Sequence, residues 1–393
     1  MSEADEPVSA RFSGLSGGWA RFDGPGGTLM VDAAIEAMRS YSASPAVANV
    51  GGAFGPSVET ADLVERCRAT VAELLGATTG GVVFGSNMTT LTFAFTRALA
   101  RSFQPGDEIV CTQLDHDANV TPWVMAAEDR GARVVMAPID RTSGRLPVSA
   151  VTDCLTERTR WVAVTGASNL IGTMPDITAI VAAAHDAGAR VFVDAVHLAP
   201  HRRIDMRALG CDALVTSPYK WYGPHAGVLA LDPDLVETVQ PYKVRPAPAA
   251  GPRRFETGTP SFEAIAGIEA AARYLLAGDI DRTGAAEGEV FAPLLDGLGS
   301  MSHVTVHGPA DLADRAPTTL FSVAGMTADA VAAALASRQI AVWTGDCYAV
   351  ETAGALGLGD PGNGVGVRAG VVRYTSADDV QRLLLAVDGL ARA

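Results

Sequence analysis

The sequence predicts an α/β fold: a large domain built on a mostly parallel central sheet, followed by a smaller α+β C-terminal domain. Strand and helix patterns alternate from residue 58 to residue 230, which is the order that βαβ crossovers produce. Residues 161–164 are all apolar, as expected of a strand buried on both faces of such a sheet. The chain has 393 residues, 48% of them hydrophobic, and is long enough for more than one core.

The individual elements follow from the periodicity of apolar residues. Apolar residues at helical spacing indicate helices, and short apolar runs bounded by polar or small residues indicate strands. Gly188 ends one helix, because glycine accepts the left-handed conformation at low cost. The expected elements are helix 58–75, strand 82–84, a helix to about 99, strand 108–111, helix 119–130, strands 133–136 and 161–164, helix 177–187, strands 191–193, 213–215 and 227–230, and helices 262–276, 285–298 and 378–391.

The alternation stops between residues 245 and 260, where prolines and glycines cluster. Such a cluster is typical of a connection between domains. We therefore expect an N-terminal segment of residues 1–28, a large domain of residues 29–254, and a small C-terminal domain of residues 255–393 that includes its connecting helix.

The chain is acidic, with 30 Lys and Arg against 44 Asp and Glu and a formal net charge of −14. Such a surface repels nucleic acid and anionic membranes. Its five cysteines are scattered without C-x-x-C spacing, which argues against a disulfide framework and a zinc site. The N-terminus lacks the pattern of a signal peptide, and no uncharged apolar stretch of 18 residues occurs. We expect a cytoplasmic protein without nucleic-acid or membrane partners.

Polar residues follow four of the expected strands in the large domain: His116, Asn169, Asp194, and the pair Ser217 and Lys220. Ligands bind at the carboxyl ends of the strands of an open parallel sheet. The sequence therefore predicts one crevice in which these side chains meet.

Lys220 stands among aromatic residues, in Ser217-Pro218-Tyr219-Lys220-Trp221-Tyr222-Gly223-Pro224. Desolvation lowers the pKa of an ammonium group and frees the amine as a nucleophile. An isolated lysine more often extends from a loop into solvent. Asp194 at the neighbouring strand end favours the functional interpretation, since a carboxylate beside a pyridine nitrogen keeps that nitrogen protonated. The alternative for Asp194 is a helix cap.

Residues 85–90 precede a helix and offer backbone N–H groups, hydroxyls and a positive helix end, which suit one phosphate. They lack the G-x-x-x-x-G-K-[ST] of a nucleotide-binding loop. His197 and His201 form an H-x-x-x-H, but Pro200 interrupts any helix that would place both rings on one face, so we expect no metal site.

Together these motifs resemble the class V aminotransferase family of fold-type I pyridoxal-phosphate enzymes, in its cysteine desulfurase-like and selenocysteine lyase-like branch. The similarity extends from about residue 21 to the C-terminus, and S-x-x-K-x-Y-G-P together with D-x-x-H is its most specific part. The resemblance implies pyridoxal 5′-phosphate as cofactor, an amino acid as substrate, and a homodimer.

The resemblance also implies residue roles. Lys220 would hold the cofactor as a Schiff base and act as general base, and His116 would stack on the ring and relay protons. Thr259 would reach the phosphate bound by the partner subunit. The expected cofactor-binding residues are Asn87, Met88, Thr89, His116, Asn169, Asp194, His197, Ser217, Lys220 and Thr259, and the expected substrate-binding residues are Arg368, Trp343 and Asn119, without a metal.

Several positions depart from the family pattern. Tyr219 stands before the lysine in place of histidine, Trp343 replaces an arginine, and Thr375 replaces an asparagine. Desulfurases of this type carry their persulfide cysteine in T-G-x-x-C. Here that position is Tyr348, and Cys347 falls one residue early.

Elimination needs no protein cysteine, so the leading hypothesis is C–S bond cleavage (β-elimination) of cysteine or a cysteine S-conjugate. Transamination, epimerisation and decarboxylating deamination of another amino acid are alternative reactions with the same cofactor. A non-catalytic pyridoxal-phosphate-binding protein is a hypothesis from a different class, and the intact Lys220 and Arg368 argue against it.

Overall fold

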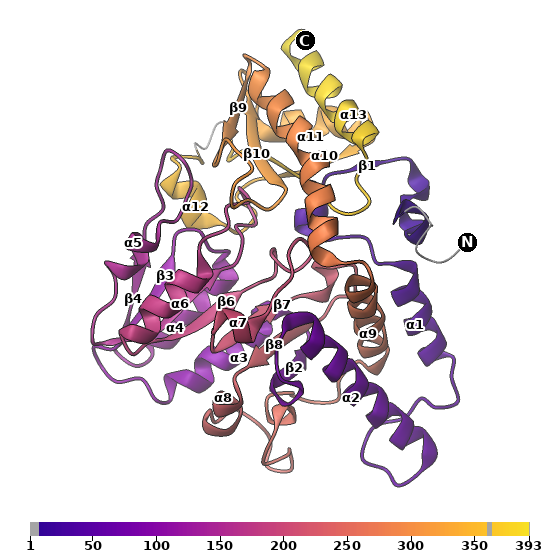
Figure 1. Cartoon of the computed structure of the whole chain (residues 1–393), viewed down its shortest axis with the longest axis vertical. Helices are drawn as coiled ribbons and strands as arrows, with labels where there is room; N and C mark the ends of the chain where they lie inside the picture. The colour runs from indigo at the N-terminus through magenta and orange to yellow at the C-terminus, as the bar shows by residue number, and fades with distance from the viewer. Residues whose placement is uncertain (1–7, 360–363, 393) are drawn as a thin grey trace.

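The computed structural model describes residues 8–359 and 364–392. The first residues of the chain, on which the signal-peptide interpretation rests, lie outside this part. The described chain contains a seven-stranded sheet with helices on both faces, a four-stranded sheet, and a two-stranded pair (Figure 1).

The seven-stranded sheet is mostly parallel, as predicted. The strand expected at residues 227–230 is the exception, being antiparallel to both of its neighbours. It follows the preceding strand through a short connection, whereas a parallel return requires a crossover of a dozen or more residues. The strand order is β2 (Val82–Gly85), β8 (Gly227–Leu231), β7 (Ala213–Thr216), β6 (Arg190–Asp194), β5 (Thr159–Thr165), β3 (Glu108–Thr112) and β4 (Arg133–Ala137).

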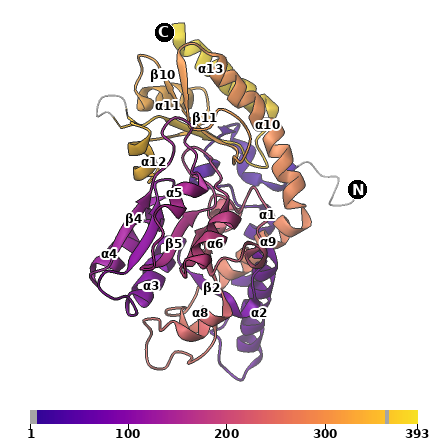
Figure 2. The ribbon, with the colours of Figure 1, turned by 60° about the vertical axis from the view of Figure 1, so that its left-hand side comes forward.

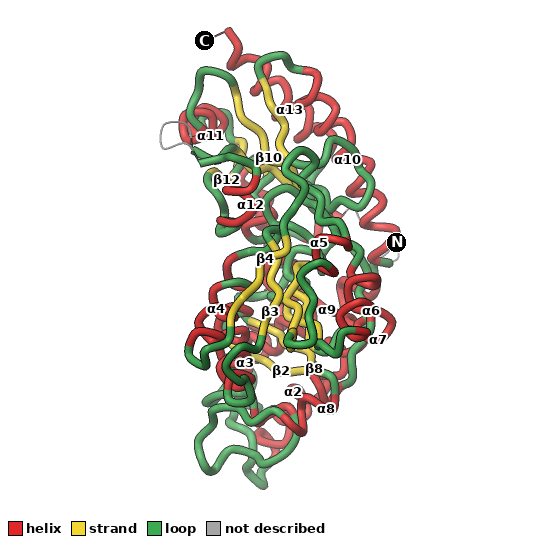
Figure 3. Tube along the Cα trace, turned by 90° about the vertical axis from the view of Figure 1, so that its left-hand side faces the viewer, coloured by secondary structure: helices red, strands yellow, loops and turns green. Residues whose placement is uncertain are grey.

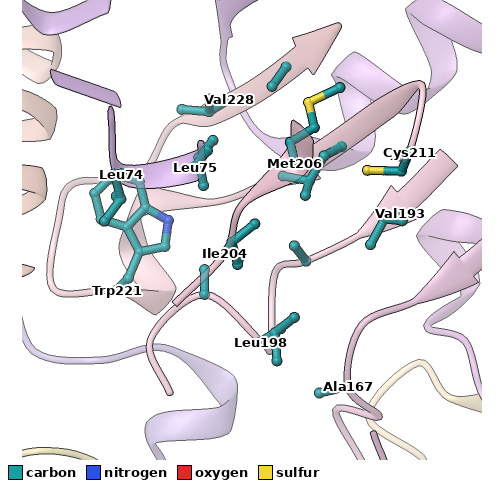
Figure 4. Packing of buried hydrophobic residues seen from close by; sticks show 14 of the residues in the cluster. Leu74, Leu75, Ala167, Val193, Leu198, Ile204, Met206, Cys211, Trp221 and Val228 are labelled. Carbon is teal, nitrogen blue, oxygen red and sulfur yellow. The ribbon is translucent and has the colours of Figure 1, made fainter. Parts of the chain in front are cut away.

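Helices cover both faces of this sheet because side chains of each strand alternate between two cores. In β6, Val191 and Val193 enter one core and Phe192 enters the other. Figure 4 shows part of the first core, where Leu74 and Leu75 lie near Trp221. The flanking helices are α2 (Gly55–Leu75), α3 (Met88–Ala100), α4 (Thr121–Glu128), α5 (Val148–Thr152), α6 (Ile177–Asp186), α7 (Met206–Leu209) and α8 (Pro233–Thr238).

The second sheet is antiparallel and has its own core, which draws on Phe291, Phe321 and Leu383. Figures 2 and 3 show this part at one end of the long axis of the molecule and the seven-stranded sheet toward the other. Its elements are β9 (Val304–His307), β10 (Thr318–Val323), β12 (Trp343–Thr344), β13 (Val367–Gly370), α10 (Ile280–Ser300), α11 (Ala328–Ala336), α12 (Val350–Ala355) and α13 (Ala377–Asp388).

The packing of α9 and of the N-terminal segment bears on the expected boundary after residue 254, which stays a prediction. Helix α9 (Phe262–Ala277) packs against α1 (Asp32–Ser42) and α2, and its apolar residues belong to a core of the large sheet. Near the N-terminus, β1 (Ala20–Arg21) pairs with β11 (Ile340–Ala341), and Ala20 and Phe22 enter the small core. We therefore propose a division between α9 and α10, with residues 20–22 assigned to the small domain.

Within residues 8–359 and 364–392, no helix combines the length and the hydropathy that a membrane span requires. All five cysteines are free thiols.

Candidate active site

The candidate site lies where the carboxyl ends of β6 and β7 meet the small domain. Asp194 is the last residue of β6 and pairs with Val215 of β7, and Lys220 lies in the turn that follows β7. Arg368 comes from β13 of the small sheet, and its charge acts on Lys220 together with that of Asp194. The structure therefore brings these three side chains, which are far apart in the sequence, to one place.

Lys220 carries an amine of unusually low basicity. Burial, followed by the positive charge of Arg368, lowers its pKa to about 7, although Asp194 has the opposite effect. The Nζ atom donates a hydrogen bond to the backbone carbonyl of Pro25 and lies 5.3 Å from the centroid of the Tyr219 ring. An amine with this pKa is largely unprotonated just above neutral pH and is then a nucleophile.

An N-terminal segment that sequence reasoning missed closes one side of the site. Besides the carbonyl of Pro25, it contributes Gly26, which packs against the indole of Trp343; a Cβ atom at residue 26 would lie 2.3 Å from the indole Nε1. The backbone N–H of Thr28 donates a 2.9 Å hydrogen bond to the residue before the lysine. The run Gly24-Pro25-Gly26-Gly27 was the available indication, because small residues allow such close approach.

Asp194 is a buried carboxylate. Burial raises its pKa to about 6, although the backbone N–H of Val196, 2.9 Å from Oδ1, and the charge of Lys220 oppose this rise. A cationic N–H group beside the carboxylate would stabilise its ionised form. The protonated nitrogen of a pyridine ring is such a group.

His116 follows β3 and begins a short 3-10 turn. Its Nδ1 accepts a 3.0 Å hydrogen bond from the backbone N–H of Ala118, so the neutral ring carries its hydrogen on Nε2. Burial, followed by the charges of Lys220 and Arg368, lowers its pKa to about 4. The ring is therefore neutral at physiological pH, and the Tyr348 ring stacks on it with centroids 5.4 Å apart.

Asn169 and Arg368 meet across the two domains. The Nη1 atom of Arg368 donates a 2.8 Å hydrogen bond to the backbone carbonyl of Asn169. Among the described residues, the Nε of Arg368 and the side-chain Oδ1 of Asn169 have no hydrogen-bond partner, although both are buried. Unpaired buried groups of this kind are costly until a ligand satisfies them, and a guanidinium group suits a carboxylate.

His197 lies three residues after Asp194 and is also buried. One of its ring nitrogens, Nε2, is 2.9 Å from the hydroxyl of Thr318. Burial lowers its pKa well below the usual range, and the charge of His201 adds to that effect. His197 is therefore a neutral hydrogen-bonding group within the site.

The groups expected to hold a phosphate lie at the start of α3 and after β7. The fully buried hydroxyl of Ser217 has no hydrogen-bond partner in the described chain, which leaves it available to a ligand. Asn87 caps α3 by accepting a 2.8 Å hydrogen bond from the backbone N–H of Thr90, so its side-chain Oδ1 is already used. Met88 is buried in an apolar core, whereas Thr89 is half-buried in the first turn.

Asn119 was expected to contact the substrate, and this stays a prediction. Its side chain is fully buried, where Nδ2 donates to Asp115 over 2.7 Å and Oδ1 accepts from the indole of Trp123 over 3.2 Å. These hydrogen bonds support the segment that carries His116.

Thr259 and Trp343 lie at the surface. The exposed Thr259 belongs to a loop that shares a hollow with Ser86 and Thr90, beside the start of α3. Trp343 is 52% exposed, and its Cα pairs with that of Arg368 across two antiparallel strands. Directly opposite residues of such strands project from the same face, so Trp343 flanks the guanidinium group.

The loop between β12 and α12 places its backbone against the large domain. Asn169 donates a 2.8 Å side-chain hydrogen bond to the carbonyl of Cys347, and the backbone N–H of Asp117 donates one of 2.7 Å to the carbonyl of Tyr348. Cys347 and Tyr348 both have left-handed backbones, with φ of 50° and 62°. Two such non-glycine residues in succession are strained, and strain of this kind is often found at functional sites.

These residues fit pyridoxal 5′-phosphate. The chain offers an unprotonated amine for the aldehyde, a buried carboxylate for the ring nitrogen, and a neutral imidazole beside the ring position. A hydroxyl without a partner and a helix N-terminus suit the phosphate. The amine of Lys220, the carboxylate of Asp194 and the hydroxyl of Ser217 thus each match one part of the cofactor.

Comparisons with known proteins agree with this assignment. The family model described as aminotransferase class-V matches residues 21–383. An uncharacterized protein of Mycobacterium tuberculosis is 30% identical over 396 residues, 96% of each chain, and a cysteine desulfurase of Dickeya dadantii is 30% identical over 351 residues, 86% of this chain and 83% of that one. The apo structure of a cysteine desulfurase from Thermococcus onnurineus NA1 superposes with a TM-score of 0.92 at 27% identity, covering 98% and 97% of the two chains. Since the family model spans most of its length, the chain belongs to the aminotransferase class-V family, as its motifs predicted.

Proposed function

We propose that this protein binds pyridoxal 5′-phosphate through Lys220 and cleaves the C–S bond of cysteine or a cysteine S-conjugate. The observation that carries the proposal is the meeting of Lys220, whose pKa is lowered to about 7, with the buried Asp194 and the buried Arg368. The similarity to proteins named cysteine desulfurases supports a cysteine-like substrate.

Each residue of the site then has a task. Bound pyridoxal phosphate supplies an electron sink for negative charge that develops at the substrate α-carbon. Asp194 would pair with the ring nitrogen, the neutral His197 would serve the 3-hydroxyl, and Asn169 would contribute its unpaired Oδ1. Ser217 and the first turn of α3, with Thr89, would hold the phosphate.

The protein also positions the substrate and moves the proton. Arg368 binds the substrate carboxylate by charge-assisted hydrogen bonds. The Lys220 amine accepts the α-proton, since its pKa lies near neutral pH, where a general base is most effective. His116, which carries its hydrogen on Nε2, can relay a proton to the departing sulfur.

A sulfur group leaves as a thiol in this scheme, so no protein cysteine is required. Two exposed aromatic residues flank the site: Trp343 beside Arg368, and Tyr348 over His116. Such rings offer contact area to a substituent on sulfur. We therefore propose that a cysteine S-conjugate is a better substrate than free cysteine.

We further propose a homodimer in which Thr259 of each subunit reaches the phosphate site of the other. Exposed apolar side chains lie near the Thr259 loop, and Val244 shares a hollow with it. Burial of such residues is the usual reason for association. Nucleic acid and membranes are not proposed as partners, and a cytoplasmic location stays a prediction.

The proposal is tested by the products. Purified protein loaded with pyridoxal phosphate is incubated separately with cysteine, S-benzylcysteine and alanine, and products are identified by mass spectrometry. We expect pyruvate and ammonia from both sulfur-containing substrates, with hydrogen sulfide from cysteine and benzyl thiol from S-benzylcysteine. Formation of a keto acid without ammonia or thiol release would indicate transamination and contradict the proposal.

A further inference from the structure

A buried acid–base pair lies behind the cofactor site and has no part in the reaction proposed above. Glu287 of α10 accepts a 2.7 Å hydrogen bond from the Nδ1 atom of His201, and each side chain is only 2% exposed. Burying two ionisable groups costs several kcal/mol of desolvation, and apolar residues of similar size would often be as stable. A buried pair of this kind is therefore weak evidence of a purely stabilising role.

Helix α10 reaches His201 through a close backbone approach. Gly284 lies one turn before Glu287, and a Cβ atom at residue 284 would lie 2.1 Å from the backbone carbonyl oxygen of His201. Residues three apart share one face of a helix. Glycine at residue 284 thus lets the helix lie close enough for Glu287 to reach the imidazole.

The pair acts on the loop that follows β6. The ring of His201 contacts the ring of His197 edge to face, with centroids 5.4 Å apart. The carboxylate of Glu287 therefore holds one side of His201. The other side of His201 supports the imidazole of His197, which faces the cofactor site. A ring fixed by packing and by a hydrogen bond presents its neighbour in one orientation.

The same carboxylate also contacts the loop that carries Lys220. The hydroxyl of Tyr222 lies 3.5 Å from the second oxygen of Glu287 and accepts a 3.2 Å hydrogen bond from the backbone N–H of Arg373. Tyr222 has a left-handed backbone, with φ of 70°, and its backbone N–H donates a 2.8 Å hydrogen bond to the hydroxyl of Thr28. Tyr222 lies two residues after Lys220, so a movement of the Tyr222 ring also shifts the backbone that carries the lysine.

We propose that Glu287 is a positioning residue of the cofactor site, which holds the His197 loop through His201 and the Lys220 loop through Tyr222. This inference rests on the proposed binding of pyridoxal phosphate. The electrostatics agree with this proposal. Burial is the main cause that lowers the pKa of His197, and the charge of His201 is the second cause. Burial is likewise the main cause that raises the pKa of Tyr222, and the charge of Glu287 is the second.

The test replaces Glu287 by its isosteric amide and compares it with a matched control on the same helix. Glu287→Gln keeps the shape and removes the charge, whereas Glu289→Gln makes the same change at an exposed position. Affinity for pyridoxal phosphate is measured by fluorescence titration, and the visible circular dichroism of the bound cofactor reports its orientation. Hydrogen exchange of the cofactor-free proteins reports the order of residues 195–202 and 217–223.

For Glu287→Gln we expect about tenfold weaker binding of pyridoxal phosphate, which corresponds to the loss of one hydrogen bond to a charged group. We also expect altered visible circular dichroism and faster exchange in both loops, while Glu289→Gln behaves as wild type. Binding within twofold of wild type, with unchanged dichroism and exchange, would overturn the inference.

A second variant decides the case in which Glu287→Gln does not fold. The double substitution His201→Leu with Glu287→Leu removes both polar groups together, so no unpaired buried charge remains. We expect it to fold and to show the same loss of affinity and the same spectral change. Wild-type affinity and dichroism in this variant would overturn the inference. Wild-type protein that binds no pyridoxal phosphate would instead overturn the proposed function itself.

Discussion

Lys220 sets the pH at which the protein can take up its cofactor. Its pKa is lowered to about 7, so the ammonium form predominates below that pH and the free amine above it. We expect the rate of pyridoxal phosphate uptake by cofactor-free protein to rise with pH through about 7 and then to level off, as followed by visible absorbance. Lys220→Ala should abolish both the absorbance band and turnover. A midpoint near pH 10, the value of an ordinary lysine, would show that burial does not act on this amine.

Arg368 should determine how tightly the substrate carboxylate binds. Arg368→Ala is expected to raise KM by about tenfold to a hundredfold, since a hydrogen bond to a charged group contributes roughly 1.5–3 kcal/mol. Arg66→Ala, at an exposed position of α2, serves as the control. Kinetics within a factor of two of wild type would mean that another group holds the carboxylate.

Cys347 tests whether a protein thiol takes part. Burial raises its pKa, although the charge of Arg368 opposes this, so its thiol is a poor nucleophile at neutral pH. We expect Cys347→Ala to retain most activity, like the control Cys154→Ala at another half-buried cysteine. A loss of more than about a hundredfold with cofactor still bound, roughly 2.7 kcal/mol in the barrier, would assign sulfur transfer to Cys347.

At the scale of elements, the N-terminus of α3 should couple helix stability to phosphate binding. Asn87 caps α3, and Asp176 caps α6 in the same way by accepting from the backbone N–H of Ala179 over 3.0 Å. Each substitution by alanine should cost about 1 kcal/mol in the free energy of unfolding. Only Asn87→Ala should also weaken binding of pyridoxal phosphate. Equal cofactor affinity in the two variants would exclude α3 from the phosphate site.

Periodicity predicted the long helices and the buried strands because those segments follow one simple pattern. Helix 58–75 and the strand at 161–164 appear with only small changes in their ends, as α2 and β5. The direction of β8 was not predictable from its apolar residues, since direction depends on how the chain returns. The helix expected at 119–130 begins instead with a 3-10 turn that ends at Asn119.

The candidate site was less predictable where it depends on contacts between distant segments. Residues at strand ends could be found, because strand direction places them at one edge. The closeness of Gly26 to Trp343 could not, since these residues lie on different segments whose packing is set by the whole fold. The internal hydrogen bonds of Asn119 were unpredictable for a related reason: a motif shows that a residue is required, but not whether its side chain faces inward or outward.

For the whole molecule, the proposed homodimer makes an expectation about mixed subunits. Thr259→Asp should weaken cofactor binding, because an added carboxylate repels the phosphate of the partner subunit. A Lys220→Ala subunit has an intact Thr259, so a dimer of the two variants should recover one complete site. Activity should therefore rise above that of either variant alone after the two are mixed and allowed to exchange subunits. An active monomer in sedimentation, or no recovery on mixing, would contradict the shared site.

The N-terminal segment that closes the site imposes an order on how the protein matures. Residues 20–21 are synthesised early, but their strand partner Ile340–Ala341 emerges from the ribosome near the end of translation. Trp343, against which Gly26 packs, is made equally late. The contacts that join this segment to the small domain can therefore form only near the end of translation.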